Sequence, residues 1–280
     1  MKPTEARVLL TGASGGIGQA TARALRAAGA AVLLVGRSAE RLEQQAQQLV
    51  QAGADTSRVR WAQADINRAG DRALLVREAQ RLDCNVVIHN AGLPAFGRLG
   101  ALDAEEIDAV LQTNLLAPML LTQALLPRLQ NLPAAQLVFV GSVLGSIGLP
   151  GFSVYSASKF GLHGFAQALR RELAGTKVRV QYIGPRSTDT GFNDPAVRHY
   201  NQATGTAQDT PDVVASEILR LLQDGTAERF LGFPEKLAVR LNALVPQWLD
   251  GSFRRHRDSL PTPTPTSIPN DITPLKGHAT

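Results

Sequence analysis

The sequence predicts an α/β fold in which a doubly wound parallel sheet carries helices on both faces. Short apolar runs of strand-forming residues alternate with helix-length segments from the N-terminus to about residue 230. These runs are apolar throughout instead of at every second residue, which is typical of strands that are buried on both faces. Right-handed crossovers between such strands give a doubly wound sheet.

The predicted strands and helices follow one another in a regular order. The first helical segments lie at residues 17–29 and 39–53, and Gly29 is suited to end the first of them. The six predicted strands lie within residues 7–10, 30–36, 58–65, 85–92, 135–142 and 177–185.

Composition narrows the class of protein. Hydrophobic residues make up 44% of the 280 residues, which is enough for a substantial core, and the single cysteine, Cys84, excludes an intramolecular disulfide. The start of the chain does not resemble a secretory signal, and Leu115–Leu126 is shorter than a membrane span requires. We therefore expect a cytoplasmic protein, with a peripheral membrane position as a secondary option.

The net charge of +5 is spread along the chain. A basic protein meets nucleic acid, anionic membranes or phosphorylated ligands. The arginines are not interleaved with aromatic residues in one block, so we do not expect nucleic-acid binding.

The sequence divides into three parts. Residues 1–233 are predicted to form the dinucleotide-binding and catalytic domain, and residues 234–258 an amphipathic, basic extension. Residues 259–280 are rich in Pro and Thr and lack an apolar period, so we expect disorder there.

The extension has an apolar face at helical spacing, with cations beside and after it. This face comprises Leu237, Leu241, Leu244, Val245 and Trp248, and the cations are Lys236, Arg240, Arg254, Arg255 and Arg257. One interpretation is a helix that lies on an anionic membrane. The other, which we favour at this stage, is a helix that packs against the domain or a partner subunit.

A glycine-rich turn follows the first predicted strand. Thr11, Gly12, Gly16 and Gly18 form a T-G-x-x-x-G-x-G pattern that opens the first predicted helix. Glycines let backbone N–H groups approach a pyrophosphate, which a helix N-terminus favours electrostatically. An ordinary turn is the simpler alternative, but the strand–turn–helix context favours dinucleotide binding.

Together with Asn90–Gly92, Tyr155 and Lys159, this turn resembles the short-chain dehydrogenase/reductase family over residues 6 to about 230. The resemblance implies a Rossmann-like fold and hydride transfer between a nicotinamide cofactor and a carbonyl or alcohol. The cofactor residues it implies are Gly12, Ser14, Gly16, Ile17, Gly18, Arg37, Asp65, Asn90, Ala91, Gly92, Tyr155, Lys159, Pro185, Thr188 and Thr190.

The end of the second predicted strand indicates the cofactor. Gly36 stands where NAD-preferring members carry an acid, and Arg37 follows it. An arginine fork suits a 2′-phosphate, so we expect NADP(H) and consider NAD(H) less favoured. A solvated surface arginine is the alternative, and Gly15 lies where some members add a second basic residue. Asp65 matches the adenine-contacting aspartate of the family, or else it forms a turn at the strand end.

Tyr155 and Lys159 are four residues apart and therefore share one helix face. A free tyrosine, with a pKa near 10, is a poor acid at neutral pH, and a nearby ammonium lowers that pKa. Tyr155 is then expected to deliver a proton to a carbonyl oxygen while hydride reaches the carbon. In the family, the lysine also holds the nicotinamide ribose.

Ser142 and Asn114 complete the tetrad that the resemblance implies. Ser142 ends the fifth predicted strand, where it is expected to hydrogen-bond the substrate oxygen, and Asn114 is expected to position a water in the proton path. Each has a simpler alternative: Ser142 as a helix N-cap, Asn114 as a buried amide, Tyr155 as a core aromatic and Lys159 as a surface residue. All four in the family's order favour catalysis.

One departure concerns Arg186, which replaces the family's glycine after Pro185. Backbone near Thr188 is expected to face the nicotinamide, and Thr190 matches the family's threonine. Three roles for Arg186 stay open: crowding of that edge, exposure to solvent, or contact with a phosphate.

We predict no metal site, because His89 and His163 lack partners at ligand spacing and fit packing roles, and we expect Cys84 to be inert. The resemblance implies a homodimer or homotetramer. The helix with Tyr155 offers an apolar stripe for it, unless the stripe packs within the subunit. The stripe comprises Leu162, Phe165, Ala166, Leu169 and Leu173.

The predicted function is NADP(H)-dependent reduction of a small-molecule carbonyl, or oxidation of the alcohol. A non-catalytic NADPH-sensing or scaffold protein is the alternative outside the enzymes, and a 3-oxoacyl-carrier-protein reductase is an alternative within them. Residues 192–210 are taken as a polar substrate loop that does not identify the substrate.

Overall fold

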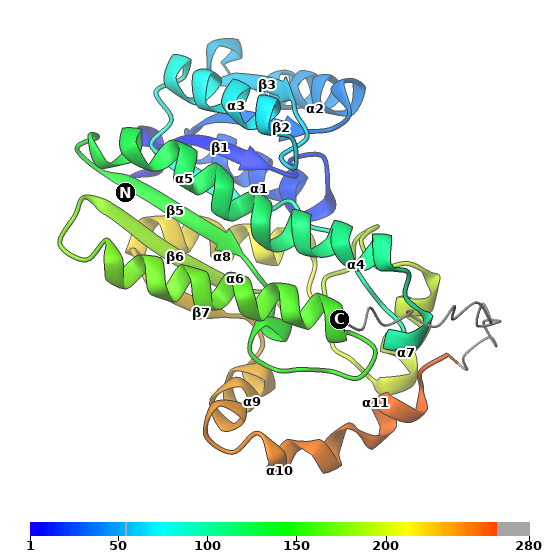
Figure 1. Cartoon of the computed structure of the whole chain (residues 1–280). Coiled ribbons are helices and arrows are strands. Elements are labelled where there is room, and N and C mark those ends of the chain that lie inside the picture. Colours follow the sequence, from blue (N-terminus) through cyan, green and yellow to red (C-terminus); the bar gives the residue numbers. More distant parts are fainter. Residues whose placement is uncertain (54, 262–280) are drawn as a thin grey trace, which may run out of the picture.

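A seven-stranded parallel sheet organises the computed structural model, which describes residues 1–53 and 55–261 (Figure 1). Its order is β3-β2-β1-β4-β5-β6-β7, so the direction of winding reverses between β1 and β4. The strands are β1 (Arg7–Thr11), β2 (Ala31–Gly36), β3 (Val59–Gln63), β4 (Val86–His89), β5 (Ala135–Val140), β6 (Val178–Gly184) and β7 (Glu228–Phe230). The doubly wound, Rossmann-like fold is confirmed.

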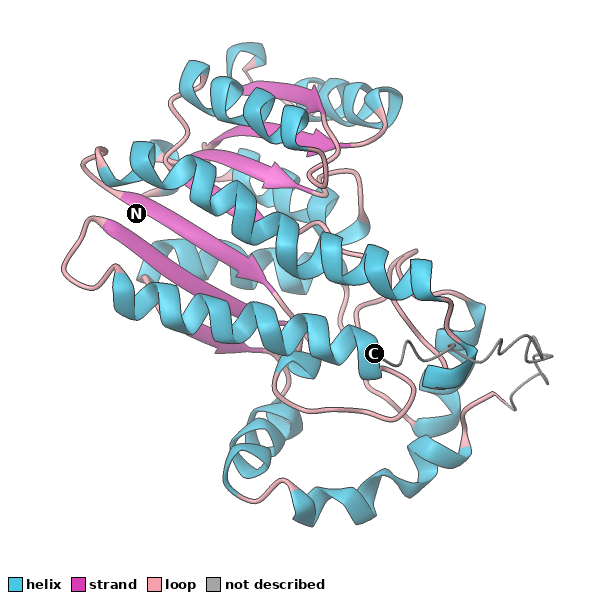
Figure 2. Cartoon of the chain, viewed as in Figure 1, coloured by secondary structure: helices cyan, strands magenta, loops and turns pink. Residues whose placement is uncertain are grey.

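Helices cover both faces of the sheet (Figure 2). One face packs against α3, α5 and α6, and the other against α1, α2 and α8. The α-helices are α1 (Gly16–Ala27), α2 (Ala39–Gln51), α3 (Ala69–Arg81), α4 (Ala104–Leu111), α5 (Ala117–Gln130), α6 (Ser153–Glu172), α7 (Pro195–Thr204), α8 (Pro211–Asp224), α9 (Phe233–Leu244), α10 (Gln247–Asp250) and α11 (Arg254–Asp258).

The pleat of the strands explains their uninterrupted apolar sequences. Leu9 and Leu33 are register partners that point into one core, whereas the neighbouring pair Val8 and Val32 points into the other. Both cores lie between sheet and helices, so successive apolar positions of these strands are buried on both faces of the sheet.

The segment from Ala104 to Gln130 is one nearly continuous helix, because the π-helical turn η4 (Gln112–Leu116) joins α4 to α5. It is the one helix among the described residues that is long and apolar enough to cross a membrane. Its residues Leu121, Leu125 and Leu129 are buried in the core of the subunit. The apolar residues of its second half are therefore explained by packing against the sheet.

The stripe expected to join subunits lies inside the subunit. Leu162, Ala166, Leu169 and Leu173 are buried in the core beneath α6, and Phe165 packs at its edge. The expectation that this stripe forms a subunit interface is therefore wrong, because these side chains already cover the sheet. The alternative of packing within the subunit is confirmed.

Two elements were not expected from the sequence. The short edge strand β7 extends the sheet beyond β6, and α7 occupies much of the segment taken as a polar loop. The helix signals were present: the Asp194 carboxylate caps the N–H of Val197 at 2.7 Å, Pro195 is the first helical residue, and Gly205 ends the helix at φ 70°.

After β7 the chain leaves the sheet and runs through α9, α10 and α11 along one end of the molecule (Figure 1). The last of these helices, α11, packs against α7. The division at residue 233 stays a prediction. Residues 262–280 of the expected disordered tail lie outside the described residues.

Candidate active site

The glycine turn after β1 is held by close backbone approaches. Gly12 has φ +64°, and a Cβ there would lie 2.7 Å from the Cα of Ala91. A Cβ on Gly18 would lie 2.2 Å from the carbonyl oxygen of Gly12. No side chain fits either approach, so the turn requires glycine at both places.

The Asn90–Gly92 segment braces this turn from β4. The Asn90 amide nitrogen donates to the carbonyls of Thr11 and Gly12, each at 3.1 Å. The Thr11 hydroxyl in turn accepts from the backbone N–H groups of Asn90 and Ala91, at 3.0 and 3.1 Å. The two segments singled out in the sequence therefore form one structure at the point where the sheet reverses.

The residues at this turn fit a pyrophosphate. Helix α1 begins after Gly15 with no side-chain cap and no acidic residue in its first turn, which leaves backbone N–H groups for an anion. A Cβ on Gly16 would lie 2.5 Å from Thr190, so the loop after β6 closes against the same turn. Ile17 packs at the edge of the core and fixes the start of the helix.

Two arginines follow β2, Arg37 in the loop after it and Arg41 on α2. Arg37 is exposed, and among the described residues its side chain makes no hydrogen bond. Arg41, on the first turn of α2, donates to the carbonyl of Ser14 at 2.8 Å. Arg41 was not expected from the sequence, although a basic residue in the first turn of a helix that follows the second strand was a usable signal.

Asp65 forms the turn at the end of β3. Its carboxylate accepts from the N–H of Asn67 at 3.0 Å, and its own N–H donates to Asp71 at 2.7 Å. The strand-end role is thus present, and the adenine contact stays a prediction.

Tyr155 and Lys159 share one face of α6, as expected. The Lys159 ammonium is buried, donates to the carbonyl of Val140 at 3.2 Å and lies 5.6 Å from the centre of the Tyr155 ring. A Cβ on Gly92 would lie 3.6 Å from this ammonium, which places Asn90–Gly92 beside it.

Burial dominates the protonation of this pair. It raises the pKa of Tyr155 to about 12, while a hydrogen bond with Ser142 acts in the opposite direction. It lowers the pKa of Lys159 to about 8. The expectation of a lowered Tyr155 pKa is wrong for the protein alone, because desolvation of the phenol outweighs every other influence. Tyr155 is therefore protonated and uncharged at pH 7.

Ser142 lies two residues beyond the end of β5, near Tyr155. Its hydroxyl accepts from the N–H of Leu144 at 3.1 Å and donates to the carbonyl of Pro185 at 3.4 Å. Ser142 thus caps the 3₁₀ turn η5 (Val143–Gly145), as its simpler alternative proposed. The same hydroxyl lies near enough to Tyr155 to influence the pKa of the phenol, and the contact with a substrate oxygen stays a prediction.

Tyr182, which was not expected from the sequence, holds both the backbone N–H and the carbonyl of Ser142. Its hydroxyl accepts from the N–H of Ser142 at 3.1 Å and donates to the Ser142 carbonyl at 3.0 Å. A Cβ on Gly141 or Gly145 would lie 2.0 or 2.4 Å from this hydroxyl, so both glycines make room for it.

His163 supports Tyr182 from α6. The two rings stack with centres 4.3 Å apart. The imidazole also contacts the Ser146 hydroxyl at 3.1 Å and the Glu228 carboxylate at 3.3 Å. His163 was expected only to pack. Its ring does pack on Tyr182, but it also makes polar contacts with Ser146 and Glu228.

Asn114 lies within the π-helical turn and is fully buried. Its side chain accepts from the N–H of Leu93 at 2.7 Å and donates to the Leu93 carbonyl at 2.9 Å and the Ser158 hydroxyl at 3.1 Å. The buried-amide alternative is confirmed, and the proton relay stays a prediction.

Arg186 is held by two carboxylates. It pairs with Asp209 at 2.7 Å and with Glu235 at 3.5 Å. These ion pairs argue against exposure to solvent and contact with a phosphate, since the guanidinium is occupied by carboxylates, and crowding of the nicotinamide edge stays a prediction. Nearby, the Thr188 carbonyl accepts the Asn193 amide at 2.9 Å.

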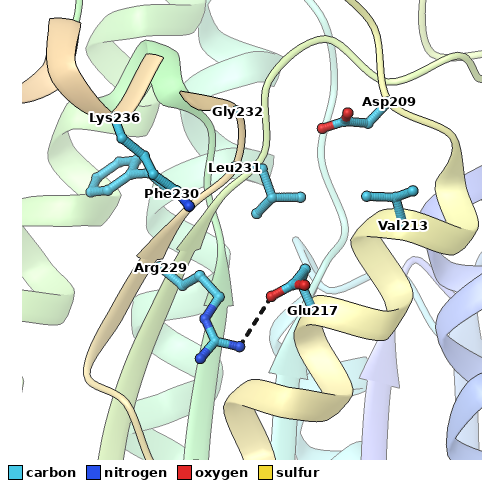
Figure 3. A pocket seen from close by; sticks show the side chains of 8 residues that line it. All are labelled: Asp209, Val213, Glu217, Arg229, Phe230, Leu231, Gly232 and Lys236. Atoms are coloured by element: carbon cyan, nitrogen blue, oxygen red, sulfur yellow. Dashed lines mark hydrogen bonds and ion pairs between the residues drawn. The ribbon is translucent and has the colours of Figure 1, made fainter. Parts of the chain in front are cut away.

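Other candidate chemistry is limited. Within residues 1–53 and 55–261 no group of three or more potential ligands is placed to hold a metal. His89 stacks on Phe139 and contacts Thr122, which confirms its packing role, and Cys84 is buried. A cavity of about 230 Å³ between β7 and α8 is crossed by the Arg229–Glu217 ion pair, and none of the predicted site residues lines it (Figure 3).

An open parallel sheet with a glycine turn at its reversal point, and a tyrosine, lysine and serine on the adjoining edge, define a nucleotide-binding oxidoreductase.

Comparison with known proteins gives the particular family. Residues 6–201 match the family model described as short chain dehydrogenase. The chain is 34% identical to a ketoacyl reductase, HetN, of Nostoc sp. over 79% of this chain and 76% of that protein. It is 32% identical to dehydrogenase/reductase SDR family member 7B of Bos taurus, over 85% of this chain and 77% of that protein. This chain belongs to the short-chain dehydrogenase/reductase family.

A solved structure supports the same assignment. The crystal structure of a variant of actinorhodin polyketide ketoreductase with NADPH superposes with a TM-score of 0.73. The two chains are 27% identical, and the match covers 82% of this chain and 97% of the ketoreductase.

Proposed function

We propose that this protein is an NADP(H)-dependent oxidoreductase that reduces a carbonyl to an alcohol, or catalyses the reverse oxidation. The observation that carries the proposal is the grouping of Tyr155, Ser142 and Lys159 beside a glycine turn that fits a pyrophosphate. The tyrosine is protonated at neutral pH, which is the form that reduction consumes.

Each residue has a distinct task in this reaction. A bound nicotinamide supplies the hydride that reaches the carbonyl carbon. The Tyr155 hydroxyl gives its proton to the carbonyl oxygen, and the Ser142 hydroxyl hydrogen-bonds that oxygen. The Lys159 ammonium stabilises the phenolate that is left and holds the cofactor ribose. Asn114 positions the water through which the phenolate regains a proton.

The arginines after β2 support a preference for NADP(H). Arg37 is exposed, Arg41 lies against Ser14, and position 36 is a glycine and not an acidic residue that would repel a phosphate. Asp65 is assigned to the adenine, and Pro185, Thr188 and Thr190 to the nicotinamide side. The NADPH in the related ketoreductase structure is consistent with this preference. Arg37→Ala should weaken NADPH binding by ~1.5–3 kcal/mol and leave NADH nearly unchanged in equilibrium titrations. Equal effects on both cofactors would remove Arg37 from the 2′-phosphate site.

A β-ketoacyl thioester is the substrate class with specific support. Two of the similar proteins are named as a ketoacyl reductase and a polyketide ketoreductase. The Tyr155 ring is flanked by Phe152 and Phe192, with ring centres 6.4 and 6.1 Å away, which suits an apolar chain beside the carbonyl. A non-catalytic NADPH-sensing or scaffold role is less supported, because all four tetrad positions retain their side chains.

The test is a screen of purified protein against β-ketoacyl thioesters and simple ketones, with NADPH and NADH in parallel. With any active substrate, Tyr155→Phe should reduce turnover by about 10²–10⁴-fold while NADPH binding stays intact. Full turnover by this variant would exclude the tetrad assignment. NADPH binding without turnover of any substrate would favour the sensing alternative. We also expect a homodimer or homotetramer, through surfaces other than the α6 stripe.

A further inference from the structure

The segment after β7, residues 233–261, crosses one end of the molecule as a strap of three helices (Figure 1). Polar contacts tie this strap to the domain. Glu235 pairs with Arg186 at 3.5 Å, the Asn242 amide donates to the Ser146 carbonyl at 2.8 Å, and the Arg98 guanidinium donates to the Pro261 carbonyl at 3.2 Å. The strap therefore has a fixed inner side, and that side is polar at each of these contacts.

Its large apolar side chains point to solvent instead. Phe233, Leu237, Leu244 and Trp248 are 83%, 62%, 80% and 76% exposed. Every other large apolar side chain in the described part of the chain is less exposed, the highest being Leu99 at 60%. A helix of a soluble monomer normally turns its apolar face inward. Here polar residues make the anchoring contacts and apolar ones face outward, so this face is suited to bind another surface.

The strap also stands off from the domain. A hollow of about 980 Å³ lies between α9 and the surface of α6 and β7. Phe160 lines it from α6, and Val239 and Ala243 line it from α9, where the exposed cations Lys236 and Arg240 stand at its rim beside the outer face. None of the residues of α9, α10 or α11 is buried. The expectation that the apolar face packs against the domain is therefore wrong for Leu237, Leu244 and Trp248, the three residues of that face that are exposed.

The charge around this face identifies what covers it. Lys236, Arg240, Arg254 and Arg255 are exposed, and none forms an ion pair within residues 1–53 and 55–261. Two of the three acids in the strap are already paired, Glu235 with Arg186 and Asp258 with Arg257, which leaves Asp250. Exposed apolar side chains among unpaired cations are the composition of helices that lie on anionic membranes.

We propose that the strap is a docking surface for an anionic lipid bilayer. Its apolar side chains enter the boundary between headgroups and acyl chains, and its cations contact lipid phosphates. A second copy of this chain is less suited to the face, because a two-fold contact would bring the same cations against each other. The proposal does not depend on the proposed catalytic function.

Cosedimentation of the full chain with vesicles tests the proposal. The protein should bind phosphatidylcholine vesicles that contain phosphatidylglycerol, bind pure phosphatidylcholine far less, and dissociate as the salt concentration rises. Lys236→Glu/Arg240→Glu should lower the partition coefficient at least tenfold, since each cation near an anionic surface contributes about fivefold. The control Arg77→Glu/Lys177→Glu makes the same charge change at exposed positions outside the strap and should retain most of the binding.

The apolar contribution is tested with Leu237→Ser/Leu244→Ser, which also should lower partitioning at least tenfold, because inserting one leucine is worth roughly tenfold or more. Both positions are exposed, so the fold should be unaffected, and Trp61→Ser on the edge strand β3 is the matched control. Absence of binding to the anionic vesicles, or equal binding by the strap variants, overturns the proposal. So does a shift from oligomer to monomer in the Leu237→Ser/Leu244→Ser variant without vesicle binding by the wild type, which would show that a second copy covers the face.

Discussion

Two loops at the carboxyl edge of the sheet depend on glycine for different reasons. In the turn after β1, Gly18 is pressed against the carbonyl of Gly12, a backbone atom of the same turn. In the serine loop, residues 141–146, Gly141 faces the phenol of Tyr182, which comes from the neighbouring strand β6. The first constraint is local and can be recognised as a motif. The second depends on one side chain 40 residues away from Ser142.

The strongest test of the local constraint is Gly18→Ala. The new Cβ would sit 2.2 Å from a carbonyl oxygen that no side-chain change can move. We expect NADPH affinity to fall by about 100-fold, since misplacement by one ångström is enough for losses of this size. Fluorescence titration measures it. The control Gly70→Ala, on α3, adds a Cβ with nothing within 4 Å and should bind NADPH normally. Normal binding by Gly18→Ala would show that the turn tolerates a side chain.

The distant constraint of the serine loop predicts a different outcome for Gly141→Ala. All three nearest neighbours of its new Cβ are atoms of Tyr182, at 2.0 to 2.3 Å. The substitution alone should destabilise the protein by ~1–3 kcal/mol through overpacking. In the Tyr182→Ala background it should cost almost nothing, because the clashing ring is absent. A double-mutant cycle in urea unfolding measures this coupling, and additive effects would contradict the account.

The same distinction explains how far the sequence could be used for prediction. Six strands, the glycine turn and the Tyr155–Lys159 pair could be predicted because each rests on neighbours in sequence. Tyr182 was overlooked because its role depends on a contact with the loop after a neighbouring strand. Within its own strand it is simply one more buried residue, so the local sequence does not distinguish it. The partners of Arg186 were equally out of reach, since Asp209 and Glu235 meet it only after the chain has folded.

Amphipathic faces were the least predictable feature. Helical spacing identifies an apolar face but not what covers it. The α6 stripe was assigned to a partner and lies in the core, whereas the apolar face of the extension was assigned to protein packing and presents Leu244 and Trp248 to solvent. The two faces differ in their surroundings: α6 lies on the sheet, so its stripe is buried there, whereas the strap is anchored through polar residues and leaves its apolar face exposed.

A smaller effect isolates the hydroxyl of Tyr182. Tyr182→Phe keeps the ring and its stacking on His163 but removes both hydrogen bonds to the Ser142 backbone. As a positioning residue, Tyr182 should affect kcat by about tenfold while KM for NADPH is unchanged. Thr122→Val, which removes a buried hydroxyl remote from Ser142, should lower stability without changing kcat. If both variants lose only stability, Tyr182 has a structural role alone.

The smallest predicted effect is a pH dependence that distinguishes Lys159 from Tyr155. The Lys159 pKa lies at about 8 and that of Tyr155 at about 12, both displaced by burial. As pH rises, the lysine therefore loses its proton first, while the tyrosine remains an acid. If the ammonium is needed to stabilise the phenolate, kcat/KM for carbonyl reduction should be level below pH 7.5 and fall by about tenfold per pH unit above 8.

The arginine variant of Lys159 assigns that alkaline limb. A guanidinium stays charged throughout the accessible range, so Lys159→Arg should move the decline to higher pH even if its maximal rate is lower. Stability should change in the opposite sense. The pKa of Lys159 is lowered from 10.5 in the folded chain, so between about pH 8 and 10.5 the unfolded chain binds more protons, and this group adds stability as pH rises. A decline in kcat/KM that Lys159→Arg leaves at the same pH would assign the limb to another group and remove the lysine from the proton chemistry.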